Sequence, residues 1–162
     1  MTRSEIDRYW KQFIQSLPPS AQYPETYNDT FYFGITKEDA PEIAPLVLNG
    51  TKTATGSLLW GFEAEGKPLP KVGDLNIVTD GNDFPVCIIE TTAVEIIPYD
   101  EVDEEFAYAG GEKDRTLESW REIYWTYTVY ECARIKREPT RKTPLICERF
   151  RVVYKESLTR GS

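Results

Sequence analysis

The chain has 162 residues, of which 40% are hydrophobic and 13% aromatic, a composition that fits one globular domain and excludes a disordered chain. Its formal net charge of −8 argues against strong non-specific binding to nucleic acid. Histidine is absent, which excludes nucleophiles activated by a histidine base and the ordinary zinc sites. Any catalysis must therefore use Lys, Asp, Glu, Tyr, Cys or hydroxyl groups.

The sequence gives no sign of a membrane or secretory protein. No apolar run approaches the roughly 18 residues that span a bilayer, and residues 1–11 are charged, with no apolar signal region after them. The cysteines, Cys87, Cys132 and Cys147, have no CxxC spacing, which is typical of reduced, mostly buried thiols. We therefore expect a cytoplasmic protein that has no membrane partner.

The first part of the chain alternates helical and extended patterns. Apolar residues at helical spacing predict a helix over 3–17, which two prolines end, and Thr2 to Glu5 resembles a capping box. A short extended segment is expected over 30–34. A second apolar stripe then predicts a helix that ends at Gly50, a residue suited to a left-handed cap.

The rest of the chain is rich in strand patterns and ends in helix and strand. Strands are predicted over 57–62, 75–78, 86–97 and 145–154, with a tight turn at 80–82. Helices are predicted over 100–108 and, after a cap at Thr116, up to residue 135; between them lies the loop 109–114. The pattern indicates an α+β fold with a curled antiparallel sheet or small barrel. We expect a single domain over 1–162 with a frayed tail at 157–162.

The stretch 48–57 is the most informative part of the chain. It places Lys52 among small and hydroxylated residues, where a helical pattern gives way to a strand pattern. Such a lysine can simply neutralise the carbonyls of a helix end. It can also project into a cleft, where it would bind an anion or a carbonyl oxygen, or act as a base once burial lowers its pKa. If 50–55 form a turn, Thr55 can approach the amine, and a lysine can activate a hydroxyl nucleophile.

Other residues leave similar alternatives open. Glu112 and Asp114 lie in a polar loop, which can be ordinary surface or can orient an amine or a water. Several aromatic residues can belong to the core or stack a base: Tyr32, Trp60, Tyr124, Trp125 and Tyr127. Glu148 and Arg149 are either an ion pair or a pair of which Arg149 faces the cleft.

The charge is distributed unevenly along the chain. Residues 134–160 contain nine Lys or Arg against three Glu. This basic segment can face a phosphate or an RNA strand, or it can be a set of solvated surface charges.

Five stretches identify the chain as similar to the ASCH domain family, a branch of the PUA-like superfamily, over residues 23–154. They occur in the family's order at residues 50–55, 72–74, 85–92, 112–120 and 144–150. The resemblance implies a PUA-like small antiparallel β-barrel decorated with helices. It also implies an association with RNA or translation.

One bacterial branch of the family resembles amidohydrolases that remove the acetyl group of N4-acetylcytidine. That branch uses a lysine, a threonine three residues later and a downstream glutamate, which implies Lys52, Thr55 and Glu112 as catalytic residues without a cofactor. The Thr53 hydroxyl would then stabilise the oxyanion. The widespread pattern G-x-K-x-x-E-x-R has Thr55 and Ser57 here at its acidic and arginine positions.

Other residues are expected to contact the substrate. Ser57 would lie against the substrate, Trp60 and Tyr32 would stack on its base, and Arg149 would replace the charge of the missing arginine. The partner would be RNA or a modified nucleoside or nucleotide, and nothing in the sequence indicates an oligomeric state.

Two other functions remain open. Another branch of the family is similar to metal-dependent ribonucleases, in which Lys52 would bind the scissile phosphate and carboxylates would hold a divalent metal. A non-catalytic RNA or nucleotide binder would use Lys52 and residues 134–160 for phosphate and Trp60 for stacking. The charge of −8 favours a small substrate over a long polyanion.

Overall fold

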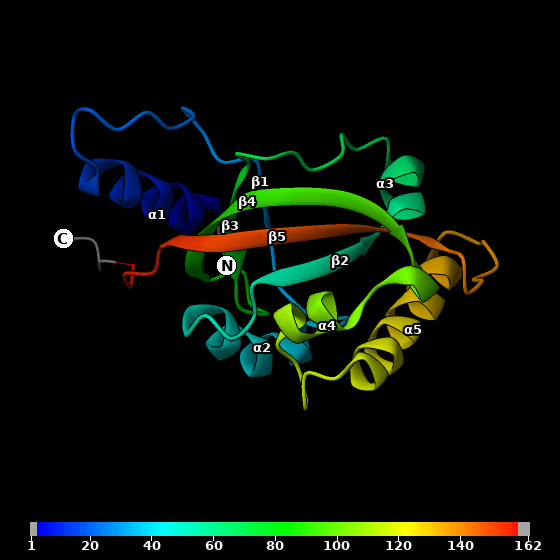
Figure 1. Ribbon diagram of the computed structural model, residues 1–162. Coiled ribbons are helices and arrows are strands. Elements are labelled where there is room, and N and C mark those ends of the chain that lie inside the picture. Colours follow the sequence, from blue (N-terminus) through cyan, green and yellow to red (C-terminus); the bar gives the residue numbers. More distant parts are fainter. Residues whose placement is uncertain (1–2, 159–162) are drawn as a thin grey trace.

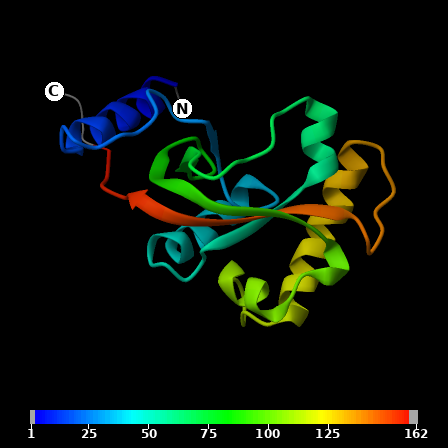
Figure 2. The ribbon, with the colours of Figure 1, turned by 45° about the horizontal axis from the view of Figure 1, so that its top comes forward.

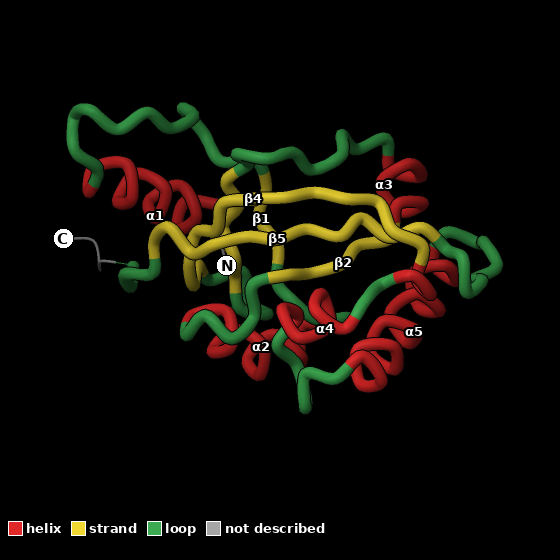
Figure 3. The backbone as a smooth tube through the Cα atoms, in the orientation of Figure 1, coloured by secondary structure: helices red, strands yellow, loops and turns green. Residues whose placement is uncertain are grey.

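A computed structural model describes residues 3–158 and shows one five-stranded sheet surrounded by helices (Figures 1 and 3). The strands lie in the order β1-β3-β4-β5-β2 and curl into a half-barrel (Figure 2). Their bounds are β1 Asp29–Phe31, β2 Ala54–Leu58, β3 Leu75–Thr79, β4 Pro85–Pro98 and β5 Pro144–Tyr154. The α+β, PUA-like fold expected from the sequence is thereby confirmed.

The sheet is antiparallel except at one edge. The short strand β1 pairs in parallel with β3, whereas every other pair of neighbours runs antiparallel. The two long strands β4 and β5 form its centre, and Leu145 of β5 lies opposite Ile97 on one side and Leu58 of β2 on the other. The strand β2, which follows Lys52, forms the other edge.

The helices lie on both sides of this sheet, with α1 and α5 at its opposite ends (Figure 1). Their bounds are α1 Arg3–Ser16, η1 Lys37–Asp39, α2 Ala40–Leu48, α3 Leu59–Glu65, η2 Tyr99–Glu101, α4 Glu104–Gly110 and α5 Leu117–Arg134. The helices predicted over 3–17 and 116–135 are confirmed to within one or two residues. Thr116 caps α5 by accepting a hydrogen bond from the Ser119 backbone N–H at 3.1 Å, as the sequence predicts.

The prediction of a strand over residues 57–62 is wrong. Strand β2 ends at Leu58, and the chain turns directly into helix α3. Gly66, in the left-handed conformation with φ of 65°, caps the end of this helix. A short apolar run does not distinguish a strand from a helix, and here tertiary packing decided between them. The predicted helix 100–108 is also divided, because Asp103 begins α4 by accepting a hydrogen bond from the Phe106 N–H.

Predictions at the two ends of the chain fall partly outside the described residues. Thr2 of the capping box and the tail from 159 onward lie outside them. The described part of the tail contacts α1, since Gln12 donates a hydrogen bond to the Ser157 carbonyl at 2.8 Å. Leu158 packs on the apolar cluster under α1.

Three apolar clusters hold the fold together. One joins α4 and α5 to β2 and β5, the second lies under α1, and the third lies between α2 and the sheet. Cys87, Cys132 and Cys147 are buried and free, as the spacing predicts. Within residues 3–158, no helix combines the length and apolar character that a membrane crossing requires.

Leu145→Ala tests the first of these clusters. Leu145 is fully buried on a central strand, so its truncation should lower the free energy of unfolding by about 2–5 kcal/mol. Urea denaturation measures this change. Val72→Ala, at a site that is 66% exposed, is the control and should shift it by less than about 0.5 kcal/mol. Equal effects of the two variants would contradict the described packing.

Candidate functional site

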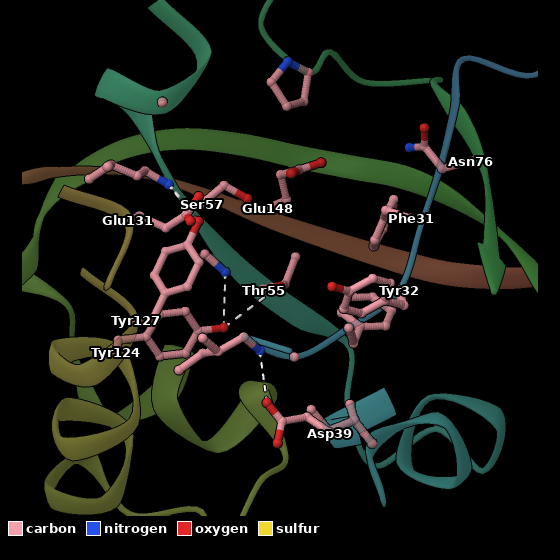
Figure 4. Close-up of a pocket in the computed structure, with 18 of the residues that line it drawn as sticks. Phe31, Tyr32, Asp39, Thr55, Ser57, Asn76, Tyr124, Tyr127, Glu131 and Glu148 are labelled. Carbon is pink, nitrogen blue, oxygen red and sulfur yellow. Dashed lines mark hydrogen bonds between the residues drawn. The ribbon is translucent and has the colours of Figure 1, made fainter. Parts of the chain in front are cut away.

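A cavity of about 960 Å³ lies against the sheet, and every strand contributes to its lining (Figure 4). The lining includes Phe31 of β1, Thr55 and Ser57 of β2, Asn76 of β3, Ile89 of β4, and Glu148 and Phe150 of β5. Helix α5 adds Tyr124 and Tyr127 to the wall. The floor of the cavity is sheet, and helices together with the loops around residues 32–35, 67–70 and 112–113 form its walls.

Lys52 lies at this cavity, between the end of α2 and the start of β2. Its side chain is 1% exposed, and its amine donates hydrogen bonds to the Gly110 carbonyl at 3.1 Å and to Glu112 Oε2 at 3.0 Å. Gly50 has φ of +82°, which a left-handed turn after α2 requires. The expected helix-to-strand junction is present, and the amine points into the protein rather than to solvent.

Gly111 permits this ion pair because it lacks a side chain. A Cβ atom placed there would lie 2.7 Å from the Lys52 Cα atom and 2.8 Å from its backbone nitrogen. Nearby, the Thr53 N–H donates a hydrogen bond to the Ala109 carbonyl at 2.8 Å. The connection between α4 and α5 is therefore pressed directly against the lysine turn.

The charge state of Lys52 differs from the expectation that burial would make it a base. Burial lowers the pKa of the amine, but the neighbouring Tyr124 and Glu112 raise it by more, so the pKa stands above its ordinary value. The amine is thus a cation at neutral pH. Glu112 is the carboxylate that balances its charge.

Tyr124 lies beside Thr55 at the cavity. Its hydroxyl accepts a hydrogen bond from the Gly56 N–H at 3.1 Å and lies 3.5 Å from Thr55 Oγ1 (Figure 4). Tyr124 also raises the pKa of the Lys52 amine. The sequence left Tyr124 among the aromatics that are either core or ligand-binding. In the structure it is 6% exposed, stacks on Trp120 and still reaches the cavity with its hydroxyl.

Glu148 is a second carboxyl group in the cavity. Burial raises the pKa of this carboxyl, the hydrogen bond from Thr91 at 3.3 Å lowers it, and the charge of Asp74 raises it further, so it stands above its ordinary value. Arg149, the next residue, points to the other side of the sheet. There it pairs with Glu105 at 2.9 Å and lies over the Phe106 ring.

The other predicted contacts divide into two groups. Tyr32 and Ser57 line the cavity together with Lys52, Thr55 and Glu112. The cavity lining does not include Thr53, Trp60 or Arg149.

These three side chains have other partners. The Thr53 hydroxyl lies 3.5 Å from the Ala109 carbonyl, and the Arg137 guanidinium covers the Trp60 ring at 3.7 Å. The expected stacking face of Trp60 is therefore occupied. Arg149 does not replace the missing arginine in the cavity, because alternation along β5 turns it away.

Asp114 and the basic segment have mainly structural partners. Hydrogen bonds from Ser119 and Thr116 hold the pKa of Asp114 at about 2, and this residue supports the start of α5. Basic residues of the segment pair with carboxylates or lie on aromatic rings, among them Arg134, Arg137, Arg141, Lys142, Arg149 and Arg151. Among residues 3–158 no three Cys, Asp or Glu side chains are grouped closely enough to hold a metal ion.

Comparison with known proteins gives one family. The family model described as ASCH domain matches residues 29–154. A crystal structure of an ASCH domain from Lactobacillus crispatus JV V101 is 33% identical, with a TM-score of 0.85 over 93% of this chain and 95% of that one. A protein from Enterococcus faecalis V583 is 32% identical, with a TM-score of 0.83 over 95% and 91% of the two chains. No curated protein matches the chain.

Gly111→Ala tests the close approach at Lys52. The new methyl group would meet the backbone of Thr51 and Lys52, in addition to the strain of a residue with φ of +74°. Gly66→Ala is the matched control, because Gly66 has φ of +65° and a Cβ atom placed there would meet nothing within 4 Å. We expect Gly111→Ala to be less stable than Gly66→Ala by more than about 1 kcal/mol in urea denaturation. Equal losses would show that only the backbone angle matters.

Glu148→Gln should stabilise the protein at neutral pH. The pKa of Glu148 is higher in the folded chain than in the unfolded one, so folding is penalised once the pH exceeds the unfolded value of about 4.3. The gain in urea midpoint should be present at about pH 8 and disappear on acidification to about pH 4. Glu90→Gln, at a glutamate that pairs with Arg151, should show no such gain. A gain that is independent of pH would contradict the burial penalty.

Proposed function

Because the chain belongs to the ASCH domain family, we propose that its cavity binds a nucleoside and that it hydrolyses an acylated pyrimidine nucleoside such as N4-acetylcytidine. The observation that carries the proposal is the buried Lys52 amine, held by Glu112 in the cavity that Thr55 also lines. This is the set of residue types that the amidohydrolase branch of the family uses.

The size and walls of the cavity support a nucleoside. Its volume of about 960 Å³ lies at the upper end of the range for small-molecule sites. Aromatic rings that can stack on a base line it at Phe31, Tyr32, Phe33, Phe62, Tyr124, Tyr127 and Phe150. Stacking does not require a charged ligand, which matters for the choice between a nucleoside and an RNA strand.

The charge of the lining favours a neutral ligand over a polyanion. Seven carboxylates and four cations line the cavity. Three of the cations, Lys52, Lys67 and Arg134, already pair with carboxylates. An RNA backbone would meet an excess of negative charge here, whereas an uncharged nucleoside would not.

The proposed reaction begins with the Thr55 hydroxyl as nucleophile. When substrate displaces water, the Lys52–Glu112 pair loses solvation, which favours transfer of one Lys52 proton to Glu112. The neutral amine then takes the Thr55 proton, and the Tyr124 hydroxyl, 3.5 Å from Thr55 Oγ1, relays it. Thr55 Oγ bonds to the acyl carbon while the carbonyl electron pair moves to its oxygen. Water later releases the acyl group and restores the Thr55 hydroxyl.

Lys52→Met tests the proposal with N4-acetylcytidine as the substrate and chromatography of released cytidine as the measurement. Loss of the proton acceptor should lower kcat/KM at least about 100-fold. Lys142→Met is the control, because Lys142 is exposed, pairs with Asp100 and lies away from the cavity lining. Its rate should equal that of the wild type. A chelator should leave wild-type turnover unchanged, since no metal takes part in the proposed reaction.

Three outcomes would contradict the proposal. An unchanged rate in a folded Lys52→Met variant would remove Lys52 from the mechanism. Saturable binding of the nucleoside without turnover by the wild type would instead establish a binding module, and cleavage of single-stranded RNA that a chelator stops would establish the ribonuclease.

A further inference from the structure

Glu148 lies directly opposite Thr55 in the sheet. The two residues are register partners in the antiparallel pairing of β2 with β5, and both line the cavity. Partners of this kind have Cβ atoms about 4.5–5.5 Å apart on the same face of the sheet. Figure 4 shows both side chains on the cavity side, from neighbouring strands. A substrate acyl carbon bonded to Thr55 would therefore lie within reach of the Glu148 carboxyl.

Structural partners do not account for this carboxyl group. Among the described residues, its one hydrogen-bond donor is the Thr91 hydroxyl, which contacts Oε1 at 3.3 Å. Glu112, by contrast, is fixed by the Lys52 ammonium at 3.0 Å. Two of the seven carboxyl groups that line the cavity are thus in unlike surroundings. Glu112 lies beside a cation, whereas Glu148 has no cationic partner within residues 3–158.

We propose that Glu148 is a further catalytic residue, the general acid that protonates the nitrogen of the departing nucleobase amine. The inference rests on the proposed acyl-nucleoside hydrolysis. It deepens that function, because the resemblance to the amidohydrolases assigns a role only to the lysine, the threonine and one glutamate.

The proton and electron movements balance in this step. The tetrahedral intermediate on Thr55 collapses, the carbonyl re-forms, and the electron pair of the breaking C–N bond moves to nitrogen. That nitrogen takes the Glu148 proton and leaves as a neutral amine. The Glu148 carboxylate then removes a proton from the water that attacks the acyl-threonine, which regenerates the carboxylic acid. The Thr55 oxygen leaves the acyl group and takes back the extra proton that the Lys52–Glu112 pair holds.

The environment of Glu148 suits an acid that holds its proton. Burial raises the pKa of its carboxyl, and the nearby Asp74 adds to this effect against the opposing hydrogen bond from Thr91. Titratable groups in different environments commonly divide acid and base roles in this way.

The experiment compares two substrates with Glu148→Gln. N4-acetylcytidine needs a proton on its leaving nitrogen, whereas 4-nitrophenyl acetate releases a stable anion and needs none. We expect Glu148→Gln to lower the single-turnover rate of cytidine release at least about 100-fold and to change the first-turnover rate of 4-nitrophenolate release by about threefold or less. Both rates report formation of the acyl-threonine and not its later hydrolysis, which the two substrates share. Glu90→Gln, on the adjacent strand β4 and outside the cavity lining, should leave both rates unchanged.

The outcomes separate this inference from the proposed function. If Lys52→Met is inactive on N4-acetylcytidine but Glu148→Gln retains the wild-type rate, the hydrolase stands and Glu148 is not its acid. Equal losses on both substrates would assign Glu148 a structural role and overturn the proposal. If the wild type turns over neither substrate, the hydrolase and its acid both fail.

Discussion

A buried ammonium group is the constraint on which the site depends. Lys52 is 1% exposed, and an unpaired charge in such a place costs several kcal/mol. The fold must therefore bring a carboxylate to it, and Glu112 comes from 60 positions later in the chain. That approach is possible because Gly111 leaves room for the backbone of Lys52. The ion pair thus ties the entrance of β2 to the start of α5, and with it places the tyrosines of that helix at the cavity.

Those tyrosines also complete the edge of the sheet. Strand β2 is an edge strand, and N–H groups on such an edge need partners other than a neighbouring strand. Tyr124 accepts a hydrogen bond from Gly56 at 3.1 Å, and Tyr127 accepts one from Leu58 at 3.0 Å. Burial raises the pKa of Tyr127, so this hydroxyl stays protonated at neutral pH. The helix closes the sheet with the same side chains that form the cavity wall, which is why Tyr124 belongs to both the core and the site.

Local patterns predicted most of the elements, and the lysine turn pointed to the candidate site. Helices α1 and α5 follow directly from apolar spacing and the cap at Thr116. The face that each strand residue occupies could not be predicted in the same way, because it depends on register with neighbours far away in sequence. Glu148 and Arg149 show this: alternation separates them, but only the pairing of β5 with β2 puts the carboxyl inside and the guanidinium outside. Trp60 was misplaced for a related reason, since a short apolar run became helix α3 and turned its ring toward Arg137.

Glu112 and Glu148, two of the carboxyl groups that line the cavity, are present for different reasons. Glu112 is explained by the fold, because without it a buried cation would have no counter-charge. Glu148 has no such explanation: burial penalises its ionised form, so an amide of the same shape would suit the folded chain better at neutral pH. A side chain that lowers stability where it stands calls for a reason outside packing. Its place opposite Thr55, on the cavity face of the neighbouring strand, supplies one in the chemistry of a bound ligand.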